Sequence, residues 1–164
     1  MKFAKHTLRA AFLFAGAGHA LAADASLAGA WTLVAVDNIM PDGSRVQLYG
    51  PDPKGMLVFD EAGRYALQMV RGDRARFAQN DKSKGTAEEN KAAVLGGNSH
   101  FGHYRYDPAA HTLVFQIAYA SFPNWDGAEQ KRPVVVNGDR MTYTVPAPTS
   151  GAGATGEVVW QRMK

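Results

Sequence analysis

Short segments rich in β-branched and aromatic residues recur along this chain, and each is bounded by Gly, Pro, Asn or Asp. This pattern is typical of an all-β sandwich or barrel, because such residues favour extended backbone and the bounding residues favour turns. Turn sequences at 60–63, 107–110 and 137–139 fit hairpins, so we predict an antiparallel, up-and-down β-barrel of about eight or nine strands. The expected strands lie near 30–36, 45–49, 55–59, 64–70, 102–106, 112–120, 132–136, 140–145 and 157–162.

One segment departs from the strand pattern. Residues 86–89 read Thr-Ala-Glu-Glu, a capping box that opens a helix, and the glycines at 96 and 97 provide a stop after Leu95. We therefore expect one short inserted helix that lies over one end or one side of the barrel. The Pro-, Ser- and Gly-rich stretch 146–156 is predicted to be a loop before the last strand.

Side chains in an extended strand alternate between two faces. In 64–70 and 112–120 this alternation separates a strongly apolar face from a mixed one, as expected where one face lines a core or a cavity and the other meets water or the helix. The alternation alone does not say which of the two faces is inside the barrel. The apolar faces consist of Tyr65, Leu67 and Met69 in the first segment and of Leu113, Phe115, Ile117 and Tyr119 in the second.

The amino-terminal segment has the features of a targeting peptide. Lys2, Lys5 and Arg9 precede the apolar run 10–18, and Ala-Leu-Ala follows at 20–22. A basic region, a short apolar region and an A-x-A site together predict a secretory signal peptide over residues 1–22, and the apolar run is too short to span a bilayer. We expect cleavage near Ala22 and one domain, residues 23–164, in the periplasm or outside the cell. The alternative is an uncleaved amphipathic anchor.

Composition argues against several partners. The chain has 18 Lys and Arg against 15 Asp and Glu, and three of the basic residues lie in the predicted signal peptide, which leaves the rest formally neutral. A neutral surface does not attract nucleic acid or anionic lipid, so we expect neither partner. We also expect no stable membrane insertion, because the apolar run 10–18 is too short to span a bilayer. The chain has no cysteine, which excludes disulfides, thiol catalysis and a lipoprotein anchor.

No motif in the sequence predicts a cofactor or a metal. Residues 151–156 match G-x-G-x-x-G, but a strand follows them and the βαβ context of a dinucleotide site is missing, so we interpret them as a loop. His100 and His103 lie three apart on an expected strand and would face opposite sides, which argues against a shared metal. Nucleophile elbows, H-E-x-x-H and P-loops are also absent from the sequence.

Several short motifs, in order along the chain, resemble those of the bacterial and fungal lipocalin-like domain family, whose members form calycin-type β-barrels. G-x-W at 29–31 opens the first strand, and an Arg at 162 stands in the last. The motifs that match directly are G-x-L at 55–57, the Gly-x-Tyr turn at 63–65 and F-P-N-W-x-G at 122–127. Two others depart slightly from the family pattern. The R-x-x-R-x-F motif starts at 71 and has one extra residue before the Phe at 77, and the 100–104 strand has His in place of the usual first Tyr.

This resemblance implies a barrel with an internal cavity for a small, largely apolar molecule. In calycins the G-x-W tryptophan closes one end of the barrel and a late arginine packs across its indole, so Trp31 and Arg162 are interpreted as structural. His100 and Phe115 stand where relatives carry other residues, so a polar site built on those positions would be altered in this chain.

We predict that a ligand is contacted by aromatic and basic residues near the barrel interior and mouth. Arg71 and Arg74 follow a strand and would clamp a carboxylate or phosphate; the alternative is a solvated loop paired with its own acidic residues. The aromatic residues would line the cavity; the alternative is ordinary core. The predicted ligand-binding residues are Tyr65, Arg71, Arg74, His100, Tyr104, Phe115, Tyr119 and Trp125, with Tyr104 and Trp125 ranked first.

Three functional hypotheses follow. The leading one is an exported, non-enzymatic binder of a small hydrophobic molecule, with or without an anionic head group. The second is a cofactor-free isomerase, cyclase or hydrolase in which Tyr104, His100 or an arginine polarises a carbonyl. The third is a structural or partner-binding barrel filled by side chains. A cavity that holds His100 or an arginine beside a buried tyrosine of shifted pKa would favour the second.

Overall fold

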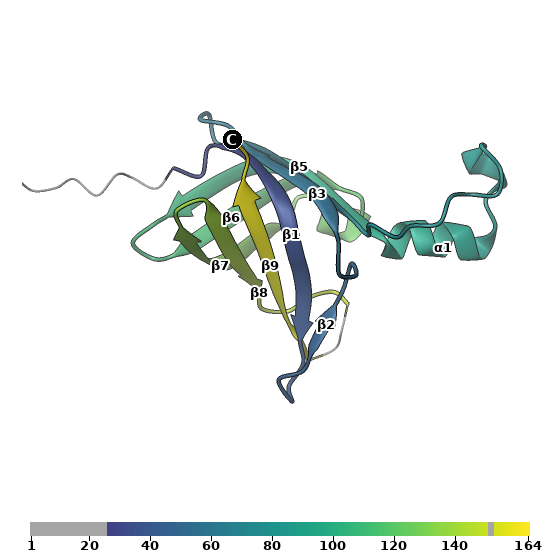
Figure 1. Ribbon diagram of the computed structural model, residues 1–164. Helices are drawn as coiled ribbons and strands as arrows, with labels where there is room; N and C mark the ends of the chain where they lie inside the picture. The colour runs from purple at the N-terminus through teal and green to yellow at the C-terminus, as the bar shows by residue number, and fades with distance from the viewer. Residues whose placement is uncertain (1–25, 151–152) are drawn as a thin grey trace, which may run out of the picture.

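The computed structural model describes residues 26–150 and 153–164. The predicted signal peptide, residues 1–22, lies outside these ranges. The chain enters the barrel at Leu27, which is buried, and leaves it after the last strand beside the same end (Figure 1).

Within the described residues, nine strands form one antiparallel sheet, and eight of them close into a barrel (Figure 1). Sequence neighbours pair from β3 to β9, and β1 closes the barrel because it pairs with both β3 and β9. The strands are β1 (Gly29–Ile39), β2 (Arg45–Gln47), β3 (Lys54–Phe59), β4 (Arg64–Val70), β5 (Gly97–Asp107), β6 (Thr112–Ala120), β7 (Glu129–Asn137), β8 (Arg140–Val145) and β9 (Thr155–Arg162). The predicted all-β, up-and-down barrel with one inserted helix is confirmed.

β2 is the strand that stands outside the closed barrel. It pairs with the last residues of β1, from Asp37 to Ile39, and extends that strand into a small hairpin below the barrel mouth (Figure 1). Arg45 of β2 donates to Asp37 at 3.0 Å and to Glu157 of β9 at 2.8 Å, which ties the hairpin to both closing strands.

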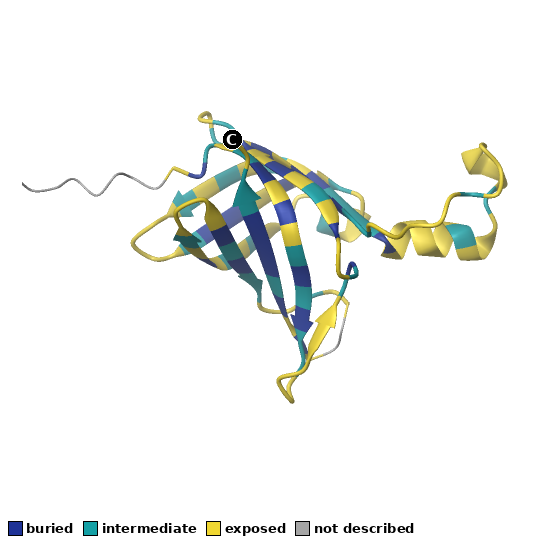
Figure 2. Cartoon of the chain, viewed as in Figure 1, coloured by how far each residue is buried: buried dark blue, intermediate teal, exposed yellow. Residues whose placement is uncertain are grey.

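Buried and exposed residues alternate along the strands (Figure 2). In β4 the predicted alternation is confirmed, and the apolar face is the inner one, because Tyr65, Leu67 and Met69 are 3–5% exposed while the residues between them are exposed. The barrel interior is therefore built by period-two alternation, as the sequence pattern indicates.

A bulge in β6 turns Tyr119 away from the interior. Phe101 of β5 pairs with Tyr119, but the next residue, Gly102, pairs with Ile117, so Ala118 is an extra residue in β6. One inserted residue reverses the alternation. Ile117 is accordingly 3% exposed and Tyr119 63% exposed, and the expectation that both lie on the same face of the strand is wrong.

Trp31 and Arg162 close the end of the barrel where β1 begins and β9 ends. Trp31 is fully buried, and the Arg162 guanidinium lies 4.2 Å from its ring centroid. The guanidinium also donates to the carbonyls of Ala28, at 2.7 Å, and Ser26, at 2.9 Å. Gly29 has φ +118°, and a Cβ there would lie 3.4 Å from an Arg162 nitrogen, so both the backbone and the arginine favour glycine in the G-x-W motif.

Side chains fill the half of the barrel next to this closed end. They come from β1, β3, β6, β8 and β9 and interlock around the two tryptophans. Trp31, Leu57, Phe59, Leu113, Met141 and Trp160 in this part of the core are each 0–1% exposed.

The inserted helix does not cover the barrel. Residues 71–96, which we call the arm, project from the rim between β4 and β5 (Figure 1). Their two ends are joined where the Arg71 N–H donates to the Gly96 carbonyl at 2.9 Å. The arm contains the 3-10 turn η1 (Lys82–Lys84) and the helix α1 (Ala87–Leu95).

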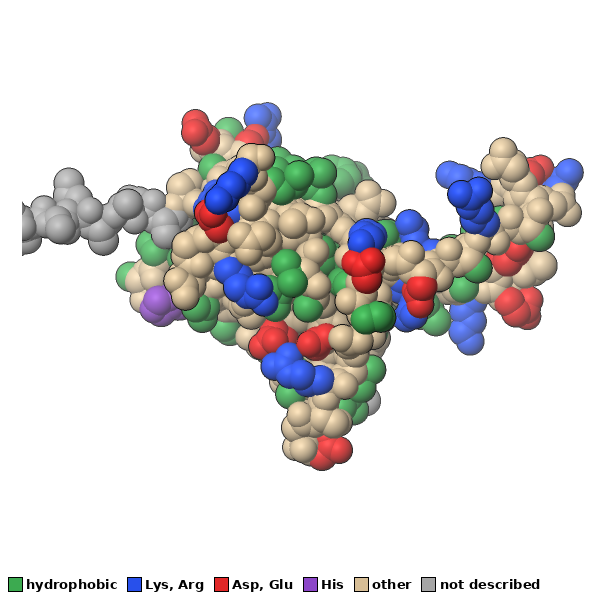
Figure 3. All heavy atoms as spheres, viewed as in Figure 1, with side chains coloured by type: hydrophobic (Ala, Val, Ile, Leu, Met, Phe, Trp, Pro, Cys, Tyr) green, Lys and Arg blue, Asp and Glu red, His purple; other side chains and the backbone are tan. Residues whose placement is uncertain are grey.

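α1 begins where the capping box predicts, since Thr86 and Glu89 exchange side-chain to backbone hydrogen bonds. It has no buried residue, and Val94 and Leu95 are 70% and 64% exposed. The expected placement of α1 over the barrel is wrong because its two large apolar residues, Val94 and Leu95, stand next to each other at its end and the helix has no broad apolar face to bury. Acidic and basic side chains instead lie side by side along the arm in solvent (Figure 3). No helix in the described ranges is long and apolar enough to cross a membrane.

Candidate functional site

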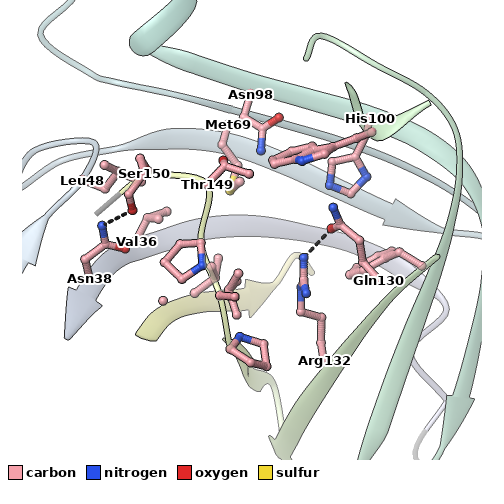
Figure 4. A pocket seen from close by; sticks show the side chains of 18 of the residues that line it. Val36, Asn38, Leu48, Met69, Asn98, His100, Gln130, Arg132, Thr149 and Ser150 are labelled. Carbon is pink, nitrogen blue, oxygen red and sulfur yellow. Dashed lines mark hydrogen bonds between the residues drawn. The ribbon is translucent and has the colours of Figure 1, made fainter. Parts of the chain in front are cut away.

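A cavity of about 350 Å³ occupies the half of the barrel that side chains do not fill (Figure 4). Val36 of β1, Met69 of β4, Phe115 of β6 and Val158 of β9 give it apolar walls. This volume lies in the range of small-molecule sites in proteins. The interior is therefore hollow at one end, which distinguishes the barrel from one filled throughout.

Residues 146–150, which follow β8, line the mouth of the cavity. Asn38, at the end of β1, is 4% exposed and donates from Nδ2 to the Ser150 carbonyl at 2.9 Å (Figure 4). This hydrogen bond fixes the segment against the barrel wall, so the mouth is narrowed by backbone as well as by side chains.

Polar side chains gather on the wall formed by β5 and β7. His100 points toward Gln130 and Arg132 across the cavity (Figure 4). Asn98, two residues before His100 on the same face of β5, has a buried Oδ1 without a hydrogen-bond partner among the described residues. A ligand with a donor group would satisfy that oxygen.

His100 is 6% exposed and forms a buried pair with Tyr65 of β4, whose hydroxyl lies 2.7 Å from Nδ1. Burial, with a smaller contribution from the nearby positive Arg132, lowers the pKa of His100 to about 4. Burial also raises the pKa of Tyr65 well above its usual range. Both groups are therefore neutral at pH 7.

Arg132 brings a positive charge to the same wall. Its guanidinium donates to the side-chain oxygen of Gln130 and to the Lys131 carbonyl, and no described carboxylate lies within ion-pair distance of it. Burial lowers the pKa of Arg132, which the neighbouring phenols of Tyr143 and Tyr65 partly offset. Burial raises the pKa of Tyr143 to about 12, so this phenol too is neutral.

The sequence model of the lipocalin-like domain matches residues 28–163, which is nearly the whole described barrel. The chain belongs to the lipocalin-like domain family. A search of curated proteins found no match.

Three of the residues predicted to bind a ligand line the cavity of this lipocalin-like barrel. They are His100, Phe115 and Trp125, the last from the 3-10 turn η2 (Pro123–Trp125) at the rim. The His100 ring stands nearly perpendicular to Trp125 at 6.1 Å and to Phe115 at 5.5 Å. Tyr65 does not line the cavity itself, and its hydroxyl is hydrogen-bonded to Nδ1 of His100, which does.

The other predicted residues of the lipocalin-like protein lie elsewhere. Tyr104 packs on Phe59 at 4.4 Å toward the filled end and donates to the Asp60 carbonyl. Tyr119 packs on Phe101 on the outer surface. Whether any predicted residue contacts a ligand stays a prediction.

Arg71 and Arg74 belong to the arm of the lipocalin-like protein and not to the cavity. Arg71 pairs with Asp73 through two hydrogen bonds of 2.8 and 2.9 Å, and Arg74 is exposed. For Arg71, this geometry matches the alternative prediction, in which the arginine lies in a solvated loop and pairs with an acidic residue of that loop.

Sequence reasoning missed the polar residues of β7. The predicted strand began at 132, whereas β7 begins at Glu129, so Gln130 and Arg132 share a face with Val134. Arg132 stands two residues before Val134, so the two side chains share one face of the strand. This spacing is the signal that could have identified Arg132 as a residue that faces the barrel interior. No cluster of three or more His, Cys, Asp or Glu able to hold a metal occurs in the described part of this lipocalin-like chain.

Proposed function

We propose that this protein is exported and binds a small, largely apolar molecule that carries an anionic head group. The cavity is the observation that supports the proposal. Apolar walls would hold the body of the molecule, and Arg132, which has no carboxylate partner among the described residues, would attract its charged end. Export is supported by the sequence features of residues 1–22.

Native mass spectrometry of the protein purified from its own host tests the binding function. We expect a fraction of the protein to carry a stoichiometric small molecule, which extraction and mass analysis would then identify. A second measurement uses N-phenyl-1-naphthylamine, a neutral fluorescent probe, which we expect to bind one molecule per chain and gain intensity in the cavity.

A matched pair of substitutions locates this binding. Val36→Phe places a larger side chain in the cavity wall and is expected to abolish probe binding, whereas Val135→Phe makes the same change on the outer face of β7 and should leave it intact. Probe binding that survives in a folded Val36→Phe protein, and in Val158→Phe as well, would argue against the cavity as the site.

Export has its own experiment. Amino-terminal sequencing of the protein recovered from the producing cells is expected to begin at Ala23. A chain that keeps residues 1–22 would contradict a cleaved signal peptide and support the amphipathic anchor.

Cofactor-free catalysis on the same molecule is the second candidate function. It is favoured by the buried Tyr65 and His100 beside Arg132 in one cavity. The pKa of about 4 makes His100 a weak base at pH 7, which places binding ahead of proton transfer. Incubation of the identified ligand with the protein distinguishes the two functions, because an enzyme would convert it and a binder would return it unchanged.

A further inference from the structure

The charge of Arg132 has no counter-charge within the described protein. Gln130 on its own strand and the Lys131 carbonyl accept its hydrogen bonds, and the phenols of Tyr65 and Tyr143 that face it are neutral. A largely buried charge is costly unless it is paired. The cavity wall is therefore arranged to receive one negative charge from a bound molecule.

The pair of Tyr65 and His100 provides a second hydrogen-bond donor next to the Arg132 guanidinium. If Nδ1 carried the imidazole proton, it would donate to the tyrosine oxygen, and the buried Tyr65 hydroxyl would have no acceptor among the described residues. That arrangement is disfavoured, because a buried donor left without an acceptor loses the hydrogen bonds that it makes with water in the unfolded chain. The hydroxyl therefore donates to Nδ1, and the proton of the neutral imidazole resides on Nε2.

The Nε2 edge of His100 is the one available to a ligand. His100 lines the cavity, whereas Tyr65 does not, and no described residue forms a hydrogen bond with Nε2. The ring points toward Gln130 and Arg132 (Figure 4). An N–H donor and a guanidinium thus face the same space from β5 and β7.

We propose that the cavity recognises a carboxylate, with Arg132 pairing with its charge, the Nε2–H of His100 donating to it, and Tyr65 acting as the positioning residue that fixes the His100 tautomer. This inference rests on the binding function proposed above. A carboxylate fits because its two coplanar oxygens accept from separate donors. One largely buried guanidinium balances a single negative charge, and Val36, Met69 and Val158 provide apolar contacts for the remainder of the molecule.

Competition between matched probes tests the inference. Decanoate and decan-1-ol share an alkyl chain and differ at the head group, and each is titrated against bound N-phenyl-1-naphthylamine at pH 7.5. We expect decanoate to displace the probe at least about tenfold more effectively than the alcohol, because a charge-assisted hydrogen bond is roughly twice as strong as a neutral one. This comparison uses the wild-type protein and does not depend on any variant folding.

Substitutions then assign the roles. Arg132→Met keeps an apolar side chain of similar length and is expected to remove the preference for decanoate while retaining the probe. Arg140→Met removes an exposed arginine on β8 and should leave the preference unchanged. Tyr65→Phe should weaken decanoate binding several-fold with little effect on decan-1-ol.

Nitrogen-15 NMR of the imidazole gives the readout that separates positioning from packing. We expect His100 in the wild type to show a protonated Nε2 and an unprotonated Nδ1, and we expect Tyr65→Phe to mix the two tautomers. A wild-type Nδ1–H tautomer would overturn the role of Tyr65.

The remaining outcomes separate the two proposals. Equal displacement by decanoate and decan-1-ol, unaffected by Arg132→Met, would overturn carboxylate recognition and leave the binding function standing. Failure of the neutral probe and of both decyl compounds to bind would contradict the binding function itself, and the present inference with it.

Discussion

The Tyr65 hydroxyl and Nδ1 of His100 lie 2.7 Å apart, and both side chains are nearly inaccessible to solvent. They come from adjacent strands: His100 of β5 pairs directly with Leu67 of β4, one inward position beyond Tyr65. Register and alternation therefore place the two polar groups together on the inner face, between the filled half of the barrel and the cavity.

This buried pair predicts a pH dependence of stability. The pKa of His100 is about 4 in the folded protein, against an ordinary value of 6.5, so the unfolded chain binds the proton first as the pH falls. Stability is expected to decline from about pH 6.5 to about pH 4, by roughly 3 kcal/mol from this group. Urea unfolding of wild type and His100→Gln across this range measures the difference, since acidic groups contribute equally to both. Parallel curves would contradict the prediction.

Because Arg162 stacks on Trp31, we predict that removing the arginine lowers the free energy of unfolding. Arg162→Ala loses the cation–π contact and two hydrogen bonds to backbone carbonyls, and we expect a loss of about 3 kcal/mol in the free energy of unfolding. Arg162→Lys keeps the charge and should recover part of this loss. Probe binding in the cavity, at the other end of the barrel, should not change, and a large change there would mean that the two ends are coupled.

Gly102 faces the β6 bulge, and we predict that no larger residue is tolerated at this position. A Cβ at this position would lie 2.1 Å from the Gln116 carbonyl oxygen, which belongs to rigid strand backbone. Gly102→Ala should destabilise the barrel by about 3 kcal/mol or prevent folding. Gly97→Ala on the same strand, where the nearest atom is a Val70 methyl at 3.4 Å, should change stability by less than about 1 kcal/mol. Similar effects of both substitutions would indicate that the bulge relaxes.

We predict that removing the amino-terminal cap of α1 destabilises the arm and leaves the stability of the barrel unchanged. Thr86→Ala removes the hydroxyl that accepts from the Glu89 N–H, which should cost α1 about 1 kcal/mol. Because α1 buries no residue, this loss should appear as faster amide hydrogen exchange in 87–95, with the global unfolding midpoint unchanged. A lowered midpoint would show that the arm contributes to the stability of the barrel.

Local features were the most predictable from the sequence. The division of β4 into an apolar and a mixed face follows from strict alternation, and the start of α1 follows from the capping box at Thr86 and Glu89. The stacking of Arg162 on Trp31 was anticipated only through the family resemblance, because no local pattern brings the two ends of a chain together.

Features that depend on register were not predictable. Tyr119 continues the apolar alternation of β6 in sequence, yet one extra residue at Ala118, opposite Gly102, reverses its direction. Arg132 resembles an ordinary strand-end arginine until β7 is seen to begin at Glu129 and to turn its alternate residues inward.

By itself, the sequence determined the class of fold, the up-and-down order of the strands and the residues at which the inserted helix begins and ends, because these depend on periodicity, turn residues and caps within short segments. Only the tertiary structure decided that the barrel is filled at one end and hollow at the other, and that Arg132 and His100 share the hollow end. Closure of β1 on β9, the bulge and the pairing register set those contacts, and they join residues far apart in the chain.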